Sequence, residues 1–172
     1  MSNLVIRQLG PNDETAFLAG LKAWKGEEIS WHSFVWSEGM THQAHLRRLS
    51  DDVRGVNLEK DRVPHTMLYG FLDEVIVGRC SVRHELNDFL RNFGGHIGYA
   101  VAPPYRRKGF GSQLFNAGQL YLKSLGVERA FMTCGFDNRP SRKMIEDAGG
   151  IFQDEAVDPS GQTVTRRYWV PL

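Results

Sequence analysis

The chain has 172 residues, a length that suits a single domain with a sizeable core. Apolar residues make up 41%, aromatic residues 11% and charged residues 24%, which are globular proportions and exclude a disordered, collagen-like or coiled-coil chain. The 21 Lys and Arg against 20 Asp and Glu leave a formal charge of +1, which gives no overall field for a polyanion, so nucleic acid is not an expected partner.

In chain order, the N-terminal part predicts a strand followed by two helices. Residues 4–9 form a short, apolar-rich run with the alternation of a strand. Asp13 is expected to cap a helix that ends near Gly26, because apolar residues recur between them at helical spacing. The aromatic-rich stretch 24–40 shows no clear period and is expected to be mostly loop. A second, more polar helix is expected over 41–52.

From Pro64 onward the apolar pattern changes to period two. Two such runs flank the turn pair Asp73-Glu74 and predict a β-hairpin. Residues 87–95 are expected to form a connecting loop, and residues 96–102 a strand that two prolines terminate. An amphipathic helix then runs to Gly126, which stands where a glycine commonly ends a helix.

The C-terminal part predicts a strand over 129–136, a short helix opened by Asn138 and a final hairpin that turns at 158–161. Consecutive strands in the middle of the chain exclude a regular βαβ alternation. The expected fold class is therefore α+β with a mixed, largely antiparallel sheet, in one domain over residues 1–172.

The cysteines and the N-terminus indicate the class of environment. Cys80 and Cys134 have no Cys or His at metal-ligand spacing, so buried free thiols are expected rather than a disulfide or a zinc site, and no metal is expected. The opening MSNLVIRQLG lacks the apolar core of a secretory signal, and no apolar run reaches the roughly 18 residues of a membrane helix. We therefore expect a cytoplasmic protein without membrane contact.

The segment most informative about chemistry joins the 96–102 strand to the amphipathic helix. Arg106, Arg107 and Lys108 supply positive charge, and Gly109 and Gly111 let backbone amides approach an oxygen closely. A helix N-terminus carries unpaired N–H groups and a positive dipole, so the segment suits a pyrophosphate. A solvated basic turn without a ligand is the alternative. A dinucleotide fingerprint fails because Leu114 occupies the place of the third glycine.

This segment resembles the acyl-CoA-binding motif of the GNAT superfamily of N-acyltransferases, Gln/Arg-x-x-Gly-x-Gly/Ala, written here as Arg106-Arg-Lys-Gly109-Phe-Gly111. The surrounding order of elements is similar as well, and residues 83–87 and 94–99 resemble a subgroup of small bacterial predicted acetyltransferases. The resemblance implies a GNAT-type mixed, mostly antiparallel sheet with splayed central strands and about four flanking helices. It also implies acetyl-CoA as the cosubstrate.

Cofactor contacts carry over from the resemblance to three places in this sequence. The strand before the motif would pair with the pantetheine arm, the motif would hold the pyrophosphate, and two residues that open the later short helix would face the arm. Asn138 could also act only as a helix cap. The residues are Tyr99, Ala100 and Val101; Arg106, Arg107, Lys108, Gly109, Phe110, Gly111 and Ser112; and Asn138 and Ser141.

Acyl transfer to an amine needs a proton acceptor, because an ammonium with a pKa of about 10.4 is almost fully protonated at pH 7. Glu85, His96 and His84 are the candidate bases, since they lie at the ends of the two strands that the resemblance places at the site. A water relay without a single base is the alternative.

The proton donor to the leaving thiolate is less well indicated. Many GNAT members have a tyrosine seven residues after the helix-opening asparagine, and here Ile145 stands at that position. Tyr99, Tyr105 and Tyr168 are candidates by residue type, or the thiolate leaves unassisted because its pKa of about 8.5 is already low.

The aromatic stretch between the two N-terminal helices falls where the superfamily usually builds its acceptor site. Trp31, Phe34 and Trp36 are the candidate acceptor residues, with packing in the core or in a homodimer as the alternative.

The first hypothesis is an N-acetyltransferase that moves acetyl from acetyl-CoA to a primary amine of a small molecule, amino acid or peptide, by direct transfer in a ternary complex. A catalytically silent acyl-CoA-binding or regulatory module is the second hypothesis, and a nucleotide-binding module is the third.

Overall fold

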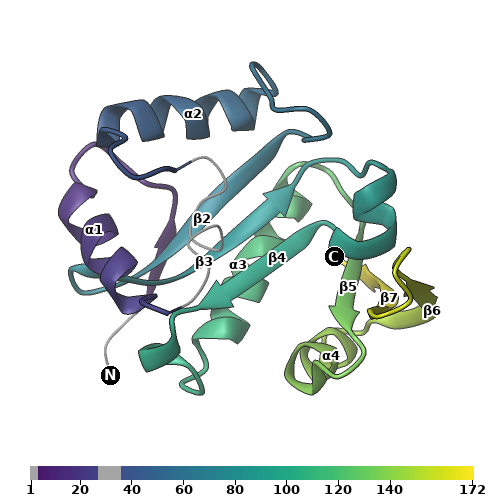
Figure 1. Ribbon diagram of the computed structural model, residues 1–172. Coiled ribbons are helices and arrows are strands. Elements are labelled where there is room, and N and C mark those ends of the chain that lie inside the picture. The colour runs from purple at the N-terminus through teal and green to yellow at the C-terminus, as the bar shows by residue number, and fades with distance from the viewer. Residues whose placement is uncertain (1–3, 27–35) are drawn as a thin grey trace.

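The computed structural model describes residues 4–26 and 36–172 (Figure 1). The expected strands and helices are present in the expected order, so the α+β class with a mostly antiparallel sheet is confirmed. The elements are β1 (Val5–Arg7), α1 (Glu14–Ala23), α2 (His42–Arg54), β2 (His65–Leu72), β3 (Val75–Arg83), β4 (Ile97–Val101), α3 (Phe110–Ser124), β5 (Arg129–Gly135), α4 (Arg139–Asp147), β6 (Ile151–Val157) and β7 (Val164–Pro171).

The two N-terminal helices differ in how their first turns are capped. Thr41 caps α2, since its hydroxyl accepts a hydrogen bond from the Ala44 amide at 3.2 Å. Asp13 precedes α1, but its side chain does not cap that helix. Its carboxylate instead pairs with the Arg7 guanidinium and accepts from the Gly10 amide, and Arg7 holds the pKa of this carboxyl below its usual range. Asp13 therefore stands at the N-cap position of α1, as expected, but its side chain makes no capping hydrogen bond.

The segment 87–95, expected to be a loop, contains a short π-helical turn over Leu90–Gly94. The Asn87 side-chain oxygen accepts from the Leu90 amide at 2.9 Å, and the Asn87 carbonyl accepts from the Arg91 amide. Leu90 is buried, so its burial fixes the turn against the rest of the molecule. A five-residue turn of this kind has too little periodicity to be read from sequence.

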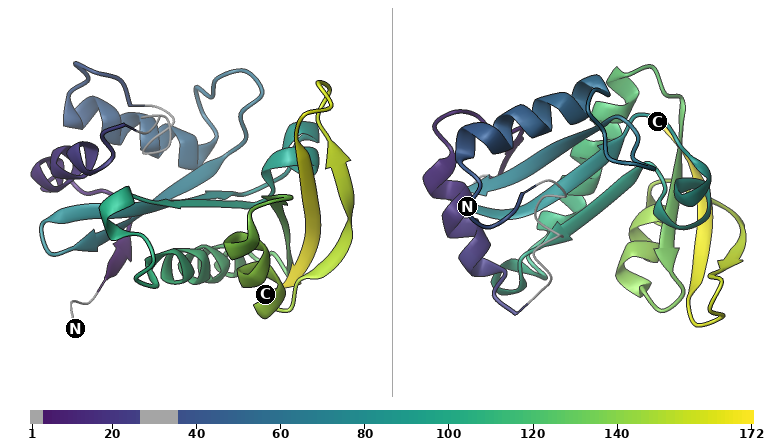
Figure 2. Two further views of the ribbon diagram at one scale, coloured as in Figure 1. Left: turned by 60° about the horizontal axis from the view of Figure 1, so that its bottom comes forward. Right: turned by 45° about the horizontal axis from the view of Figure 1, so that its top comes forward.

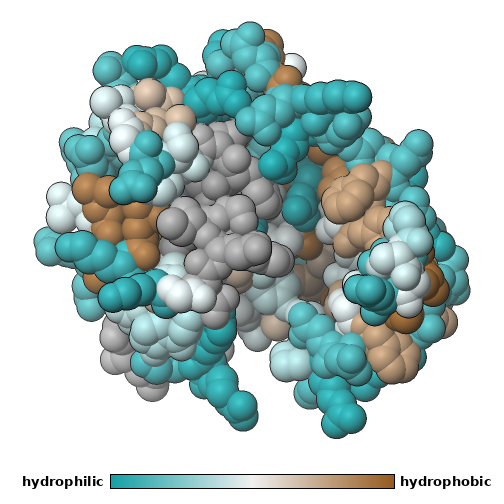
Figure 3. All heavy atoms as spheres, viewed as in Figure 1, coloured by the Kyte–Doolittle hydropathy of each residue, from teal (hydrophilic) through white to brown (hydrophobic). Residues whose placement is uncertain are grey.

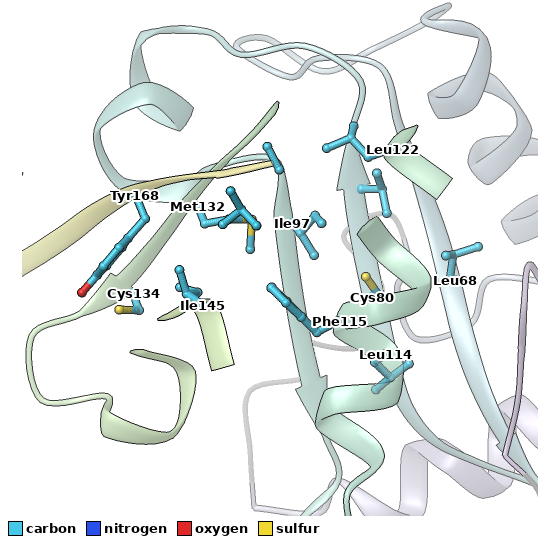
Figure 4. Packing of buried hydrophobic residues seen from close by; sticks show 13 residues of the cluster. Leu68, Cys80, Ile97, Leu114, Phe115, Leu122, Met132, Cys134, Ile145 and Tyr168 are labelled. Carbon is cyan, nitrogen blue, oxygen red and sulfur yellow. The ribbon is translucent and has the colours of Figure 1, made fainter. Parts of the chain in front are cut away.

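The described helices lie in layers on the two faces of the sheet (Figure 2). α1 and α2 cover one face, and α1 comes so close to β3 that a Cβ on Gly20 would lie 2.9 Å from the Ile76 carbonyl. α3 and α4 lie on the other face. Between them and the strands lies the larger core cluster, which includes Leu114, Phe115 and Ile145 (Figure 4). Both cysteines are buried free thiols, as expected.

The sheet divides between β4 and β5 into a four-stranded part, β1-β2-β3-β4, and a three-stranded part, β5-β7-β6. The two inner strands run in the same direction and separate along their length (Figure 1). They meet at one end, where the His96 amide donates to the Phe131 carbonyl at 2.8 Å and the Phe131 amide donates to His96 Nδ1 at 2.8 Å. These two bonds mark the point from which the gap opens.

Over residues 4–26 and 36–172, no helix has both the length and the apolar character needed to cross a membrane.

Candidate active site

The edge of β4 that faces the gap offers unpaired backbone groups. Arg83 donates to the His96 carbonyl and Ala102 donates to the Val77 carbonyl, so the even-numbered residues from 96 to 102 bond toward β3. In an antiparallel ladder the alternate residues direct their N–H and C=O groups to the other side. Tyr99 and Val101 therefore present backbone groups to the gap. Ala100, expected to do the same, directs its groups to β3.

The segment before α3 forms an exposed, positively charged turn. Arg107 (φ 61°) and Gly109 (φ 80°) both adopt the left-handed conformation, which curls the chain into the start of the helix at Phe110. The amides of the first helical turn have no carbonyl one turn earlier to bond. Arg106 folds back, and its Nε donates to the Val101 carbonyl at 2.9 Å. The amides, the exposed cations and the helix dipole together make a donor set that fits a diphosphate.

Across the gap, the first turn of α4 approaches β4. Asn138 is the helix cap, because its side-chain oxygen accepts from the Ser141 amide at 3.2 Å. The Ser141 hydroxyl lies 2.8 Å from the Tyr99 hydroxyl, and burial raises the pKa of Tyr99. A Cβ on Gly111 would lie 3.6 Å from the Tyr99 ring, so Tyr99 lies between the motif and Ser141. The space-filling view shows a notch at the lower edge of the molecule (Figure 3).

The three candidate bases lie in different surroundings. His96 is buried at the meeting point of β4 and β5, where its Nδ1 accepts from Phe131, and burial lowers its pKa to about 4. His84 lies on the α3 side of the sheet, where its Nε2 is 2.9 Å from the Thr66 hydroxyl and its ring stacks on Tyr121. Glu85 is exposed just after β3. The structure therefore does not bring the three together.

The candidate proton donors also lie in different parts of the molecule. Ile145, which stands at the position of the usual tyrosine, is only 2% exposed and belongs to the core. Tyr168 is 1% exposed on β7. Of the candidate tyrosines, Tyr99 is the one whose hydroxyl reaches a residue on the opposite side of the gap.

Of the candidate acceptor residues, Trp31 and Phe34 lie outside the described residues. Trp36 is half-buried and packs edge-on against Phe17, with ring centroids 6.0 Å apart. Phe17 belongs to the core cluster beneath α1, so the described part of Trp36's surroundings is core packing.

β3 carries a row of polar residues that are not among the site residues predicted from the sequence. Arg79, Ser81 and Arg83 alternate with Cys80 and Val82, which lie in the α3-side core. The polar side chains therefore face the other side of the sheet, and Arg79 and Ser81 are 2% and 0% exposed. The alternation itself was the available signal, because polar residues recurring every second position in a central strand are unusual.

A cavity of about 520 Å³ adjoins this row, between the end of β3, the segment before β2 and the π-helical turn. Ser81, Arg83 and His65 line it. His65 Nδ1 donates to the Val63 carbonyl at 3.1 Å, and its Nε2 lies 3.6 Å from Asp52 Oδ2. Burial lowers the pKa of His65 to about 4, so His65 is neutral at pH 7, and it raises the pKa of Asp52 to about 6, so Asp52 takes up a proton only in mildly acidic solution.

No group of three or more His, Cys, Asp or Glu suited to hold a metal ion occurs among the described residues.

Comparisons with known proteins bear on the family and the fold. The model of the acetyltransferase (GNAT) family matches residues 23–149. Among curated proteins no significant sequence match is found.

Three solved structures illustrate the shared fold. A probable acetyltransferase is 19% identical with a TM-score of 0.68, covering 99% of this chain and 94% of that one. The ribosomal-protein-S5-alanine acetyltransferase from Vibrio fischeri is 16% identical with a TM-score of 0.67, also covering 99% and 94%. A putative acetyltransferase from Salmonella typhimurium, solved with its cofactor acetyl-CoA, is 14% identical with a TM-score of 0.60, covering 98% and 94%.

Proposed function

The chain belongs to the GNAT acetyltransferase family, and from that premise we propose that it transfers the acetyl group of acetyl-CoA directly to a primary amine of a small molecule, amino acid or peptide. The observation that carries the proposal is the open edge of β4 beside the cationic turn that begins α3. The Salmonella protein of the same fold was solved with acetyl-CoA, which supports this cosubstrate.

In this proposal the residues expected from the resemblance bind different parts of the cofactor. The amides from Arg107 to Ser112 hold the diphosphate, and Arg106 and Lys108 add charge. Tyr99 offers its backbone N–H and carbonyl to the pantetheine arm in the gap, and Val101 offers its N–H, since Arg106 occupies the Val101 carbonyl. Asn138 fixes the first turn of α4 so that the Ser141 hydroxyl faces the same gap.

When bound, acetyl-CoA supplies an acetyl thioester. The N–H groups of β4 that face the gap are positioned to stabilise negative charge on its carbonyl oxygen without rearranging. We keep Glu85 as the proposed base, with water as the path between amine and carboxylate, because its carboxylate is exposed whereas His96 Nδ1 is engaged by Phe131. We assign the protonation of the leaving thiolate to the Tyr99 hydroxyl.

The assignments of base and acid are tested by the pH dependence of turnover. Glu85→Gln should lower kcat/KM for the amine about 100-fold at pH 7 and lose less at pH 10, where roughly a third of an amine with a pKa of about 10.4 is unprotonated. Tyr99→Phe should lower kcat more than Ser141→Ala does, since the latter keeps the Tyr99 hydroxyl. Unchanged pH profiles would leave the water relay and the unassisted thiolate as the mechanism.

The function itself is tested by incubating the protein with acetyl-CoA and a panel of amines while following free thiol. The protein's own cysteines add little background, since Cys80 is 0% and Cys134 is 6% exposed, and a sample without amine corrects for it. Release of CoA above this control with any amine supports the enzyme.

A catalytically silent acyl-CoA-binding module is the second candidate, favoured by the buried Ile145 in place of the usual tyrosine. Calorimetric binding of CoA together with no thiol release from any amine would support it. If calorimetry at millimolar CoA gave no heat, both candidates would fail.

A further inference from the structure

The cavity beside the end of β3 is predominantly positive. Its described lining includes the cationic side chains of Lys60, Arg62 and Arg83, against the carboxylate of Asp61. The chain as a whole is close to neutral, with a formal charge of +1, so this positive character is local. A partly enclosed cavity lined by one sign of charge raises the local concentration of ligands of the other sign.

Ser81 adds a second observation that points to a ligand. Its side chain is 0% exposed and lines the cavity, and its Oγ has no hydrogen-bond partner among the described residues. A buried hydroxyl without a partner costs about 1–3 kcal/mol. A ligand oxygen in the cavity would accept its hydrogen bond and remove that cost.

The cavity lies next to the place proposed for acetyl transfer. Ser81 pairs with Gly98 across β3 and β4, and Gly98 directly precedes Tyr99, whose backbone faces the gap. Adjacent strands lie about 5 Å apart. Gly98 also makes room for Arg83, because a Cβ at this position would lie 2.9 Å from Arg83 Nη1. Arg83 Nη1 donates to the Gly94 carbonyl at 3.2 Å, which holds the guanidinium against β4.

We propose that this cavity binds a carboxylate of the acceptor through Arg83 and Ser81, so that the acceptor is an amino-acid-like amine with the carboxylate a few bonds from the reacting nitrogen. The inference rests on the proposed function and adds the substrate class to it. A guanidinium and a hydroxyl are matched donors for the two oxygens of a carboxylate, and an exclusively cationic amine such as a polyamine would meet repulsion there.

The surroundings strengthen the preference for an anion. Arg79, on the same face of β3, is 2% exposed, and burial lowers the pKa of both Arg79 and Arg83 to about 10. Two guanidinium groups in a poorly solvated region repel each other, and an anion placed beside them gains more than it would in water. His65 favours its neutral form, and Asp52, which is ionised at pH 7 with a pKa of about 6, is not among the residues that line the cavity.

The test compares acceptors that differ only in the carboxylate. The protein is incubated with acetyl-CoA and each of the twenty L-amino acids or its C-terminal amide, and free thiol is followed. We expect kcat/KM to be about 10- to 100-fold higher for the best amino acid than for its amide. The ammonium of an amino acid amide is the more acidic, so the amide holds more free amine at a given pH, which biases the comparison against the expected result.

Variants then assign the preference to the cavity. Ser81→Ala should raise KM for the amino acid about 10-fold, leave KM for the amide within twofold and leave the melting temperature unchanged or higher, because the hydroxyl has no described partner to lose. Arg83→Gln should abolish the preference, and Arg83→Lys should retain part of it. Lys123→Gln, an exposed cation in the last turn of α3, is the matched control and should change neither KM.

The outcomes distinguish failure of the carboxylate-binding inference from failure of the proposed function. Turnover with amines that shows no preference for the carboxylate, or a preference that survives both Ser81→Ala and Arg83→Gln, overturns this inference and leaves the proposed function standing. Absence of turnover with every amine overturns the proposed function instead. In that case the cavity is tested directly, and failure of amino acids to raise the melting temperature of the CoA-bound protein overturns the inference as well.

Discussion

Gly109 and Gly111 serve the turn before α3 in different ways. Gly109 has φ 80°, a conformation that costs other residues about 1 kcal/mol, and among the described atoms nothing lies within 4 Å of the Cβ it lacks. Gly111 has no such constraint, and a Cβ there would touch the Tyr99 ring at an ordinary 3.6 Å. The first glycine thus shapes the backbone, and the second keeps the approach to the amides open.

Replacing Gly111 with valine separates folding from binding. The Cβ fits, so the melting temperature should stay within a few degrees, whereas the branched methyl groups would stand where a phosphate approaches the amides. We expect the Kd for CoA, measured by calorimetry, to rise about 10-fold or more. Gly111→Ala is the milder control. An unchanged Kd for the valine variant would contradict the placement of the diphosphate.

For single residues, the sequence predicted which residue types bind the cofactor, but not which side chains contact one another. The motif from Arg106 to Gly111 could be read because its chemistry is local to one turn. Arg83 and Ser81 could not be assigned to a cavity, because its other walls come from the segment before β2 and from a π-helical turn that has no sequence signature. Asp13 looked like a helix cap, but Arg7, six residues away, competes successfully for its carboxylate.

At the scale of elements, one side chain takes part in holding β4 and β5 together where they meet. His96 accepts the Phe131 amide on Nδ1 while its own amide donates to the Phe131 carbonyl. The histidine therefore takes the place of a backbone acceptor at the last point where the two strands touch. The β2–β3 hairpin and the elements around α3 were predictable from alternation and turn residues. The role of His96 was not, since it spans 35 residues of sequence.

His96→Leu should leave the buried Phe131 amide without an acceptor and destabilise the fold by about 1–3 kcal/mol. Asparagine presents its side-chain oxygen close to the position of Nδ1, so His96→Asn should recover most of this loss. Urea denaturation of the two variants beside the parent protein measures both values. Equal destabilisation by leucine and asparagine would show that the hydrogen bond is not what the site requires.

At the scale of the whole molecule, buried ionisable groups make stability depend on pH. Burial lowers the pKa values of His45, His65 and His96 to about 4. Between pH 6.5 and 4 these histidines are therefore protonated in the unfolded chain but mostly neutral in the folded chain. Asp52 acts in the opposite direction, because its pKa is raised from 3.8 to about 6 and the folded state binds its proton first. On unfolding near pH 5, the three histidines together take up about three protons and Asp52 releases about one. The net uptake is therefore about two protons.

The free energy of unfolding should therefore be highest above pH 6.5 and fall steadily toward pH 4, with a slope of about 2.7 kcal/mol per pH unit near pH 5. Urea denaturation at pH 7, 6, 5 and 4.5 measures this slope. Asp52→Asn removes the opposing proton and should steepen it by about half. A free energy of unfolding that stays constant from pH 7 to 4.5 would contradict the assigned pKa directions.

The open edge of β4 also bears on aggregation. Unpaired strand edges invite strands from other molecules, and this one lies in the middle of the sheet, where no outer strand can cover it. The edge is protected by its brevity, since β4 has only five residues, by Arg106, which occupies the Val101 carbonyl, and by the Tyr99–Ser141 contact that spans the opening. A thin ligand can still enter where a foreign strand with its side chains cannot, so an opening that admits the cosubstrate, as proposed above, would still exclude neighbouring protein.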